Sequence, residues 1–579
     1  MESLPACVAP NGKFWENVTE QKHSCSNQRK GCEGMARVYI LDGYLDEPSC
    51  LGVPPYIAPH VRYTYGALRD AGLRSEDIAY GIIDDLRRHP EKAEEMQGAE
   101  MVIIIAGTTV PGKYLGGKPI SLQEIRRLAA QLRRPRVILS GPIIHCNLDV
   151  GPVDHIAGEI PGLTAYQLLT GEDLTQKLSP AEIVDRWAQL GAEVTLRHPR
   201  FPYLVCEVET FRGCPRRSHC SFCSERFKKV VYQRSVAGII AEVRALADLG
   251  NAYFRLGAQT DLLLYQARRD GERLVPNPEA LEALYAGIRE AAPQLKVLHM
   301  DNINPATIAD YPAEAERALR AIARYNTPGD TAAFGLESAD PAVLAANNIG
   351  TDTEKTFRAI EIMNAAGGER EDGIPKLLPG LNFLHGLQGE SRQTMELNLE
   401  FLRRVRDAGL LLRRINIRQV NPLGQYRRTR PATAYQFQQY KDAVNREINK
   451  PMLQKVFPLG TTLKEVIVEE SEGLVAYGRQ LGTYPILVGI PGKFALGSQL
   501  HVKIVDHGYR SITGLPWPLD INRASLEQLE ALPGIGKNRA RKIFLAGKLK
   551  DMADLQALLP DADLSGLEQL GPGLFPPRE

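Results

Sequence analysis

Short apolar runs alternate with amphipathic segments through the first third of the chain. Three of the runs have the length and composition of buried parallel strands, and we expect these strands at residues 36–44, 99–107 and 134–143. Residues 60–72 and 121–134, between and beside them, place apolar side chains at helical spacing. This alternation predicts a doubly wound, Rossmann-like α/β domain over residues 35–190, with ligands beyond the carboxyl ends of its strands.

The alternation resumes after residue 195 with a second set of strands. Six successive strand–helix units predict a partial (β/α)6 TIM-type barrel over residues 195–450, with its chemistry at the carboxyl ends of the strands. Residues 236–250 and 353–367 are the clearest of its helices. We expect its strands at residues 202–209, 252–257, 295–302, 331–338, 380–387 and 413–421.

The two ends of the chain have different patterns. Residues 456–515 are rich in glycine and alternate β-branched with polar positions, which predicts a small β-barrel domain. Residues 518–579 contain two short helical stretches around a glycine hairpin. Residues 1–34 are polar and aperiodic, so we expect a flexible N-terminal extension with the folded protein beginning at Met35.

Composition and charge narrow the class of protein. The 579 residues carry a formal net charge of +1, so no overall field favours nucleic acid or a membrane surface. The sequence has no apolar run long enough to span a bilayer and no signal-peptide core, so we expect a cytoplasmic protein with no membrane partner. Its nine cysteines, an odd number, indicate reduced thiols rather than a disulfide framework.

Three of the cysteines lie close together directly after the first barrel strand. Cys214, Cys220 and Cys223 are spaced C-x5-C-x2-C. Three thiolates can hold a four-iron cluster with one iron left open for a small molecule. Structural zinc needs four ligands, and His219 or Cys206 would have to supply the fourth. The spacing alone leaves the cluster, zinc and inert thiols open.

The order of motifs along the barrel resembles the radical S-adenosylmethionine (SAM) superfamily. Residues 254–265, 334–363 and 381–402 resemble elements of methylthiotransferases at the second, fourth and fifth strands. The usual cysteine loop there is C-x3-C-x2-C, two residues shorter than this one. The resemblance implies a 4Fe–4S cluster on Cys214, Cys220 and Cys223. It also implies reductive cleavage of SAM to a 5′-deoxyadenosyl radical, with electrons from a donor such as flavodoxin or ferredoxin.

Polar residues at the strand ends are candidates for binding SAM. Carboxylate and amide groups can hold its ammonium and ribose by charge-assisted hydrogen bonds. Asp301 could instead cap a turn, and Glu337 could be a surface strand end. The residue types single out no catalytic group. The proposed cofactor-binding residues are Gln259, Asp301, Glu337 and Ser338.

The N-terminal α/β domain resembles cobalamin-binding domains and the N-terminal domain of methylthiotransferases. The Asp-x-His-x-x-Gly motif of cobalamin binding has only an off-register match around His155. A second cluster would need three cysteines, whereas only Cys50 and Cys146 are available in this domain. We therefore expect neither cobalamin nor a second cluster, and a scaffold or substrate platform instead.

The C-terminal stretches resemble two nucleic-acid-binding modules, a TRAM barrel and a helix-hairpin-helix. The hairpin glycines allow close approach of the backbone, and the following helix begins beside positive charge, a combination that binds phosphate without reading bases. The alternative is a hairpin for protein docking, because residues 516–579 hold eight Lys and Arg against nine Asp and Glu. The proposed nucleic-acid-binding residues are Gly534, Gly536, Lys537, Arg539 and Arg541.

The whole arrangement resembles a family of Fe–S oxidoreductases with a C-terminal helix-hairpin-helix motif. The leading hypothesis is a radical SAM enzyme that modifies a nucleic acid, with an RNA base as substrate. Residues 401–430 contain nine arginines and one aspartate and could line a polyanion track into the barrel. One alternative is a radical SAM enzyme acting on a small metabolite or protein, with the C-terminal modules used for assembly. A third is a zinc-containing nucleic-acid-binding protein.

Overall fold

The computed structural model describes residues 36–47, 50–107, 116–146, 148–421, 426–430 and 432–575. The chain forms two compact units. The larger unit contains Met35–Val456 together with Leu481–Tyr484. The smaller unit contains Phe457–Gln480 and the chain from Pro485 onward. No helix among the described residues is long and apolar enough to cross a membrane.

The first part of the larger unit is a parallel sheet covered by helices, as predicted. Its strands are ordered β5-β1-β6-β7-β8, the flavodoxin-like order in which the second strand lies outside the first. Helix α2 (Pro59–Asp70) and helix α5 (Leu122–Gln131) fall where the apolar spacing predicts them. A capping box at Ser121 starts α5. The strands are β1 (Val38–Asp42), β5 (Ile78–Ile82), β6 (Met101–Ile105), β7 (Arg136–Ser140) and β8 (His155–Ile156).

The barrel strands follow in two parallel sheets, ordered β15-β12-β9-β4 and β16-β17-β20-β21. Asp301 separates β15 from β16, so the second sheet continues where the first ends. The six predicted strands are all present, since the stretch 295–302 spans the β15–β16 junction. They are β9 (Val205–Glu209), β12 (Tyr253–Gly257), β15 (Val297–Met300), β16 (Asn302–Ile303), β17 (Asp330–Glu337), β20 (Leu377–His385) and β21 (Arg414–Gln419).

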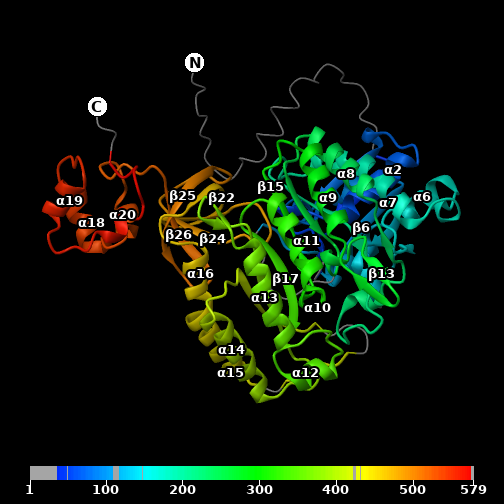
Figure 1. Cartoon of the computed structure of the whole chain (residues 1–579). Helices are drawn as coiled ribbons and strands as arrows, with labels where there is room; N and C mark the ends of the chain where they lie inside the picture. Colours follow the sequence, from blue (N-terminus) through cyan, green and yellow to red (C-terminus); the bar gives the residue numbers. More distant parts are fainter. Residues whose placement is uncertain are drawn as a thin grey trace, which may run out of the picture. The chain divides into compact units, whose positions relative to one another are not determined.

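Amphipathic helices lie outside these strands, as Figure 1 shows for the green segments of the chain. Alternate strand residues such as Phe334, Leu381 and Ile415 are buried in the common core with the helices. On each strand, the residues that alternate with these buried positions therefore face the inside of the barrel. The main helices are α8 (Val236–Asp248), α9 (Pro278–Ala291), α11 (Pro312–Tyr325), α13 (Thr353–Gly367) and α14 (Arg392–Asp407).

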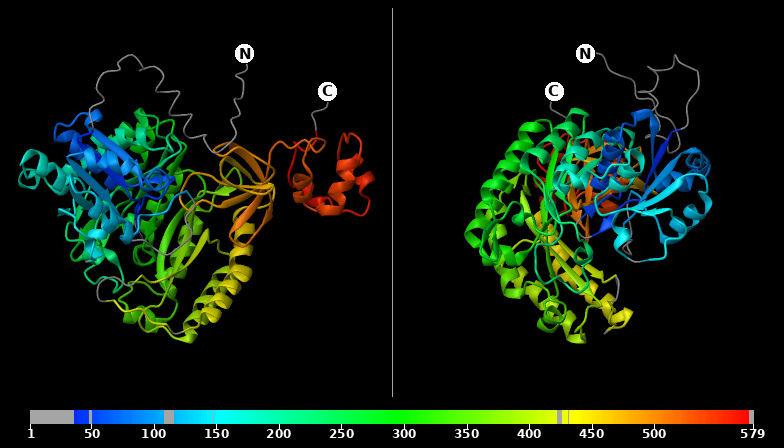
Figure 2. Two further views of the ribbon diagram at one scale, coloured as in Figure 1. Left: turned by 180° about the vertical axis from the view of Figure 1, so that it is seen from behind. Right: turned by 90° about the vertical axis from the view of Figure 1, so that its right-hand side faces the viewer.

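Two short segments from outside the predicted barrel pack at its first sheet. Strand β4 (Tyr56–Ile57) comes from the α/β part of the chain and pairs in parallel with β9. Leu481–Tyr484 comes from within the stretch predicted as a separate β domain. The backbone N–H of Thr483 donates to His299 Nδ1 at 2.8 Å, and the Tyr56 hydroxyl donates to the carbonyl of Gly482 at 2.5 Å. Figure 2 shows the α/β part, in blue and cyan, beside the green barrel strands.

The smaller unit holds a closed five-stranded barrel and a set of short helices. The barrel has the order β22-β23-β24-β26-β25 and includes one parallel pair, β24 with β26. The predicted small β-barrel is thus present, while its kinship to TRAM modules stays a prediction. The barrel strands are β22 (Thr462–Glu472), β23 (Val475–Arg479), β24 (Leu487–Pro491), β25 (Gln499–His507) and β26 (Ser511–Pro516). The helices are α17 (Leu526–Ala531), α18 (Gly536–Leu545), α19 (Met552–Leu558) and α20 (Ser565–Glu568).

Candidate active site at the cysteine loop

A two-stranded ribbon holds the base of the loop that carries the three cysteines. Strand β10 (Phe211–Arg212) pairs antiparallel with β11 (Tyr232–Gln233), and residues 213–231 between them form the cysteine loop. Cys214, Cys220 and Cys223 are free thiols of intermediate exposure. The loop therefore begins just beyond the carboxyl end of β9, the position expected for barrel chemistry.

The three thiols lie within one another's electrostatic field. Burial raises the pKa of Cys214, Cys220 and Cys223, and the charge of Cys220 adds to the rise at both Cys214 and Cys223. Among the described residues no three His, Cys, Asp or Glu side chains are already arranged as ligands of one metal ion. Three free, closely spaced thiols nevertheless fit the donor set of a cluster. Cysteines bind metal as thiolates, so metal binding releases their protons even where burial has raised their pKa.

The cysteine loop docks on the connection between α12 (Pro341–Ala346) and α13. The backbone N–H of Ser221 donates to the carbonyl of Asn347 at 3.0 Å, and the Ser221 hydroxyl donates to Asn347 Oδ1 at 2.8 Å. Arg216 donates through Nη1 to Cys220 Sγ at 3.3 Å and through Nη2 to the carbonyl of Asn348 at 2.9 Å. Gly350 makes room for this guanidinium, because a Cβ at that position would lie 2.6 Å from its central carbon.

Glu337 ends β17 beside the cysteine loop. A register shift precedes it on β17, and its backbone has a φ of 63°. Burial raises its pKa to about 8, and the positive charge of Arg418 opposes part of that rise. The Glu337 carboxylate in turn raises the pKa of Cys220. Glu337 thus lies near enough to both Cys220 and Arg418 for the charges to act on one another.

The side chain of Ser338, the next residue, forms its hydrogen bonds with the turn after β17 and with helix α14. Its hydroxyl accepts a hydrogen bond from the backbone N–H of Asp340 at 3.1 Å and donates to Asn398 Oδ1 at 3.5 Å. Ser338 is 1% exposed. Its hydroxyl therefore joins the turn after β17 to helix α14.

Gln259 and Asp301 are also occupied by groups of the chain. Gln259 is buried; the Thr210 hydroxyl donates to its Oε1 at 3.3 Å, and its Nε2 donates to the carbonyl of Leu256 at 3.1 Å. Asp301 forms a fully buried ion pair with Arg255 at 2.6 Å and accepts from the Tyr484 hydroxyl at 3.0 Å. Gln259 and Asp301 thus form their hydrogen bonds and ion pair with other barrel residues, whereas the charge of Glu337 acts on Cys220.

The inner faces of β20 and β21 present a row of polar side chains that we call the inner wall. Asn416 Nδ2 donates to Asn382 Oδ1 at 2.9 Å, and Arg414 Nε donates to Asn416 Oδ1 at 2.6 Å. The Arg414 guanidinium lies over the Tyr484 ring at 4.4 Å. Sequence reasoning noted the arginine-rich stretch but missed these positions. Strand alternation would have found them, because the buried Ile415 fixes the outward face of β21. The inner wall consists of Asn382, Arg414, Asn416 and Arg418.

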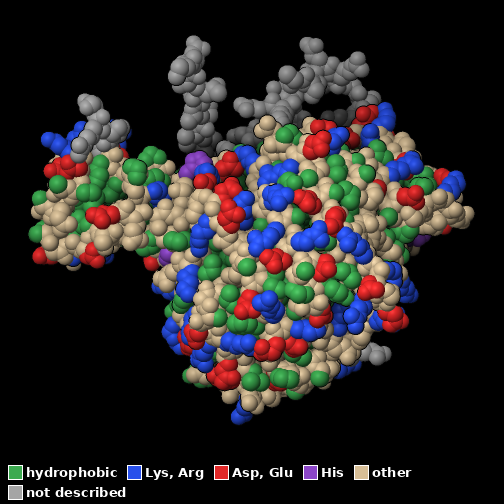
Figure 3. All heavy atoms as spheres, in the orientation of Figure 1, with side chains coloured by type: hydrophobic (Ala, Val, Ile, Leu, Met, Phe, Trp, Pro, Cys, Tyr) green, Lys and Arg blue, Asp and Glu red, His purple; other side chains and the backbone are tan. Residues whose placement is uncertain are grey.

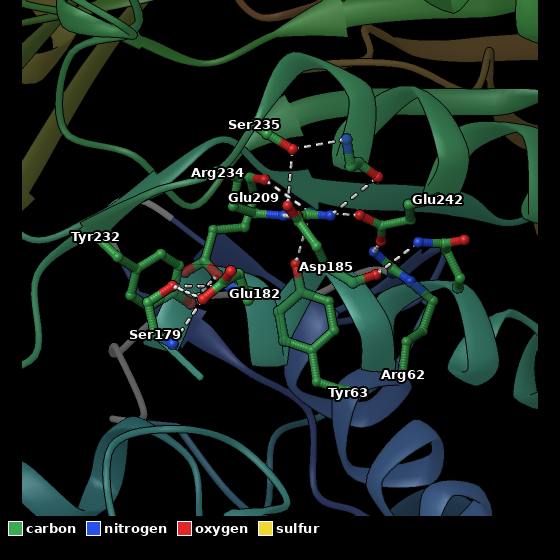
Figure 4. Close-up of polar contacts among 12 residues, drawn as sticks. Arg62, Tyr63, Ser179, Glu182, Asp185, Glu209, Tyr232, Arg234, Ser235 and Glu242 are labelled. Carbon is green, nitrogen blue, oxygen red and sulfur yellow. Dashed lines mark hydrogen bonds and ion pairs between the residues drawn. The ribbon is translucent and has the colours of Figure 1, made fainter. Parts of the chain in front are cut away.

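A buried ionic network fixes the base of the cysteine loop (Figure 4). Arg234, which follows β11, pairs with Asp185 at 2.6 Å and donates to the carbonyl of Glu209 at 3.0 Å. The Glu209 carboxylate accepts from the Tyr232 hydroxyl at 2.6 Å and from Arg212 Nε at 2.9 Å. Figure 4 shows Asp185, on helix α7 (Pro180–Leu190) of the α/β part, beside Arg234, which follows the ribbon strand β11. The network therefore ties the loop to both layers.

The radical SAM superfamily model matches residues 208–402, the region that contains the cysteine loop, Glu337 and most of the barrel. Two archaeal proteins match most of the chain. An uncharacterized protein of Archaeoglobus fulgidus is 41% identical over 528 residues, covering 90% of this chain and 97% of that protein. An uncharacterized protein of Methanocaldococcus jannaschii is 38% identical over 517 residues, covering 83% and 93%. The chain belongs to the radical SAM superfamily. It is a radical SAM enzyme, and the superfamily implies a 4Fe–4S cluster and SAM.

Solved structures of radical SAM enzymes are similar at a lower level. The methyltransferase TsrM from Kitasatospora setae, with cobalamin and a [4Fe-4S] cluster bound, has 15% identity and a TM-score of 0.45, covering 66% of this chain and 72% of that one. The cobalamin-dependent enzyme OxsB has 12% identity and a TM-score of 0.43, covering 76% and 62%. The bound cobalamin belongs to those two enzymes, and a likeness at this level does not extend it to this chain. The expectation of no cobalamin thus has no support here and stays a prediction.

Several expectations concern other residues of this radical SAM enzyme. His155 is partly exposed on β8, and Cys146 is buried at the end of the turn that follows β7. The expected N-terminal extension, residues 1–34, and the side chain of Cys50 lie outside the described residues. The expectation of no second cluster therefore also stays a prediction.

The C-terminal hairpin of the radical SAM enzyme uses one predicted phosphate ligand internally. Arg539 donates through Nη1 to the carbonyl of Gly534 at 2.8 Å and through Nη2 to the carbonyl of Asp561 at 2.9 Å. Gly534 and Gly536 both have positive φ, and a Cβ on Gly534 would lie 2.1 Å from the carbonyl oxygen of Asp563. Lys537 and Arg541 are exposed at the start of α18. Arg539 thus closes the hairpin, while Lys537 and Arg541 face water.

Proposed function

We propose that this radical SAM enzyme modifies a nucleic acid, with a base of single-stranded RNA as its substrate. The observation that carries the proposal is the inner wall, which places two arginines and two paired asparagines on the barrel face that Glu337 shares. Arginines bind phosphate, and side-chain amides form hydrogen bonds with the edges of unpaired bases.

Cys214, Cys220 and Cys223 would hold the cluster, and Glu337 would bind the ammonium group of SAM. Once bound, the cluster and SAM supply the reducing electron and the group that abstracts hydrogen. Because the pKa of Glu337 is near 8, its carboxyl group is largely protonated at neutral pH. The ammonium group of SAM would therefore pair with a carboxylate only after that proton has left. The contacts of Ser221 and Arg216 hold the thiols still while this occurs.

The charge distribution supports local rather than global recognition of a polyanion. On the face drawn in Figure 3, side chains of Lys and Arg are interspersed with those of Asp and Glu. Binding would therefore depend on short stretches such as the inner wall and the exposed Lys537 and Arg541. Such binding weakens as salt rises, because counterions are released from the phosphates.

A second candidate is a radical SAM enzyme for a small metabolite or protein, with the C-terminal unit used for assembly. The internal hydrogen bonds of Arg539 favour it, because they remove one cation from the hairpin surface. Salt-insensitive or absent RNA binding would select this candidate.

The test begins with anaerobic reconstitution of the full chain. We expect about four irons per chain, and formation of 5′-deoxyadenosine when SAM and a reductant are added. Cys220→Ala should lose the cluster, whereas Cys146→Ala, a matched control in the α/β part, should keep it. Nucleosides from cells with and without the gene are then compared. Identical nucleoside profiles would sink the RNA assignment, and iron-free protein would sink the chemistry itself.

A further inference from the structure

A polar pocket lies where the α/β sheet meets the base of the cysteine loop. Three parts of the larger unit line it: the start of α2, the loops that follow β7 and β8, and the two ends of the cysteine loop. The polar side chains that line it are His60, Ser140, His145, Glu159, Arg212 and Lys228. It lies beyond the carboxyl ends of parallel strands, where α/β sheets bind ligands.

Cations and carboxylates both surround this pocket, and Arg212 pairs with the carboxylate of Glu209 at 2.9 Å. Burial lowers the pKa of His60 well below its usual value, and the charges of Arg212, Lys228 and His145 lower it further. Of the acids nearby, Glu225 pairs with Lys228 at 2.5 Å. The Glu159 carboxylate is held by the backbone N–H groups of Lys229 and Val230, at 2.9 and 2.8 Å.

Two buried polar atoms of the pocket have no partner within the described chain. Arg212 is 4% exposed, and its Nη2 makes no hydrogen bond. Its other nitrogens are used, Nε by Glu209 at 2.9 Å and Nη1 by the carbonyl of Glu159 at 2.5 Å. His60 is 8% exposed, and its Nδ1 also makes none. Buried donors without partners are rare, so a guanidinium N–H left open at a pocket indicates a hydrogen-bond acceptor there, either an ordered water or a ligand.

We propose that this pocket binds an oxyanion, the phosphate or carboxylate group of a substrate or cofactor, through Arg212, Lys228 and His60. Neutral His60 can donate from Nδ1, and Arg212 and Lys228 supply charge-assisted bonds. Gly158, on the lining, has no atom within 4 Å of a Cβ built on it, so a ligand can approach the backbone there. Arg212 precedes Cys214 by two residues, so an anion held here lies at the root of the cysteine loop.

This inference does not depend on RNA as the substrate, because either group could belong to a nucleotide or to a metabolite. The experiment titrates the full chain with inorganic phosphate, with acetate, and with adenosine 5′-monophosphate against adenosine, by calorimetry and thermal shift. The variant is Lys228→Met. The matched control is Lys229→Met, which removes the same charge from the exposed neighbouring residue and leaves its backbone bond to Glu159 in place.

We expect phosphate or acetate to bind and to raise the melting temperature of the wild type and of Lys229→Met. Lys228→Met should bind the same anion at least tenfold more weakly. Stronger binding of phosphate and of the monophosphate assigns the site to phosphate esters, and stronger binding of acetate assigns it to carboxylates. No binding of any anion, or equal binding by both variants, overturns the proposal.

A readout without mutation covers the case in which Lys228→Met does not fold. With ¹⁵N-labelled histidine, the imidazole signals of His60 and His145 should shift on adding the anion, while that of His299, buried elsewhere in the barrel, should not. Unchanged signals for both pocket histidines at saturating anion would also overturn the proposal.

Discussion

Arg216 donates a hydrogen bond to the sulfur of Cys220 at 3.3 Å while its other terminal nitrogen holds the carbonyl of Asn348 at 2.9 Å. Arg216 lies in the stretch between Cys214 and Cys220, which is two residues longer than in the usual loop of the superfamily. The longer stretch thus brings a fixed cation to one of the cluster thiols. Gly350 provides the space in which the guanidinium rests.

Replacing this arginine should make the cluster harder to reduce. Hydrogen bonds and positive charge at a ligand sulfur stabilise the more negative, reduced cluster. In Arg216→Gln we expect the reduction potential to fall by roughly 60 mV, a tenfold change for one electron. An EPR-monitored redox titration of reconstituted protein measures it. Arg217→Gln is the control, because Arg217 pairs with exposed Glu272. Equal potentials in the two variants would refute the assignment.

Glu337 should make the protein less stable as the pH rises. Its pKa is raised to about 8 in the folded protein, above the value near 4.5 of an unfolded chain. Between these values the folded state binds more protons than the unfolded state, so the free energy of unfolding falls with rising pH. We expect Glu337→Gln to be up to about 4 kcal/mol more stable than wild type at pH 8 without SAM, with a difference below about 1 kcal/mol at pH 5. Urea unfolding at both pH values measures it, and a pH-independent difference would contradict it.

The inner wall should contribute to the salt dependence of RNA binding. We expect Arg418→Ala to weaken binding of a single-stranded RNA and to reduce the slope of log affinity against log salt by about 1, as loss of one phosphate contact does. Fluorescence anisotropy at several salt concentrations measures it. Arg404→Ala is the control, since Arg404 pairs with Glu354 between helices α14 and α13 on the outside of the barrel. Equal slopes for both variants would exclude Arg418 from the RNA site.

The C-terminal hairpin separates a structural arginine from the exposed cations. Arg539→Ala removes two hydrogen bonds to backbone carbonyls and should destabilise the smaller unit by about 1–2 kcal/mol. Lys537→Ala should leave its stability unchanged and weaken RNA binding instead. Thermal unfolding and anisotropy distinguish the two effects. If Arg539→Ala melts like wild type, the hydrogen bonds do not hold the hairpin.

Local patterns predicted the regular elements well, and the reasons are visible in particular residues. Helix α13 spans the predicted residues 353–367 because Asp352 caps its start and apolar side chains recur at helical spacing. Strand β4 could not be predicted, because two residues carry no periodicity and their pairing with β9 depends on the tertiary fold. Strand β5 was missed for a related reason, since its alternation is incomplete.

The candidate site was only partly within reach of the sequence. The spacing of the cysteines and the position of Glu337 at a strand end were visible locally. The ion pair and hydrogen bond of Asp301 were not visible in the sequence, because its partners Arg255 and Tyr484 lie 46 and 183 residues away along the chain. The contact of Arg216 with Cys220 was hidden as well, since it depends on how the longer loop folds back onto Asn348.

The hydrogen bond from the Tyr56 hydroxyl to the carbonyl of Gly482 determines which residues an active fragment of the enzyme must include. A fragment cut at the predicted limits of the barrel, residues 195–450, would lack both Tyr56 and Gly482. The ion pair between Arg255 and Asp301 would then be opened to water from below. Any excised catalytic core must therefore begin before the first helix and run on into the β-barrel region, although most of the chemistry lies between them.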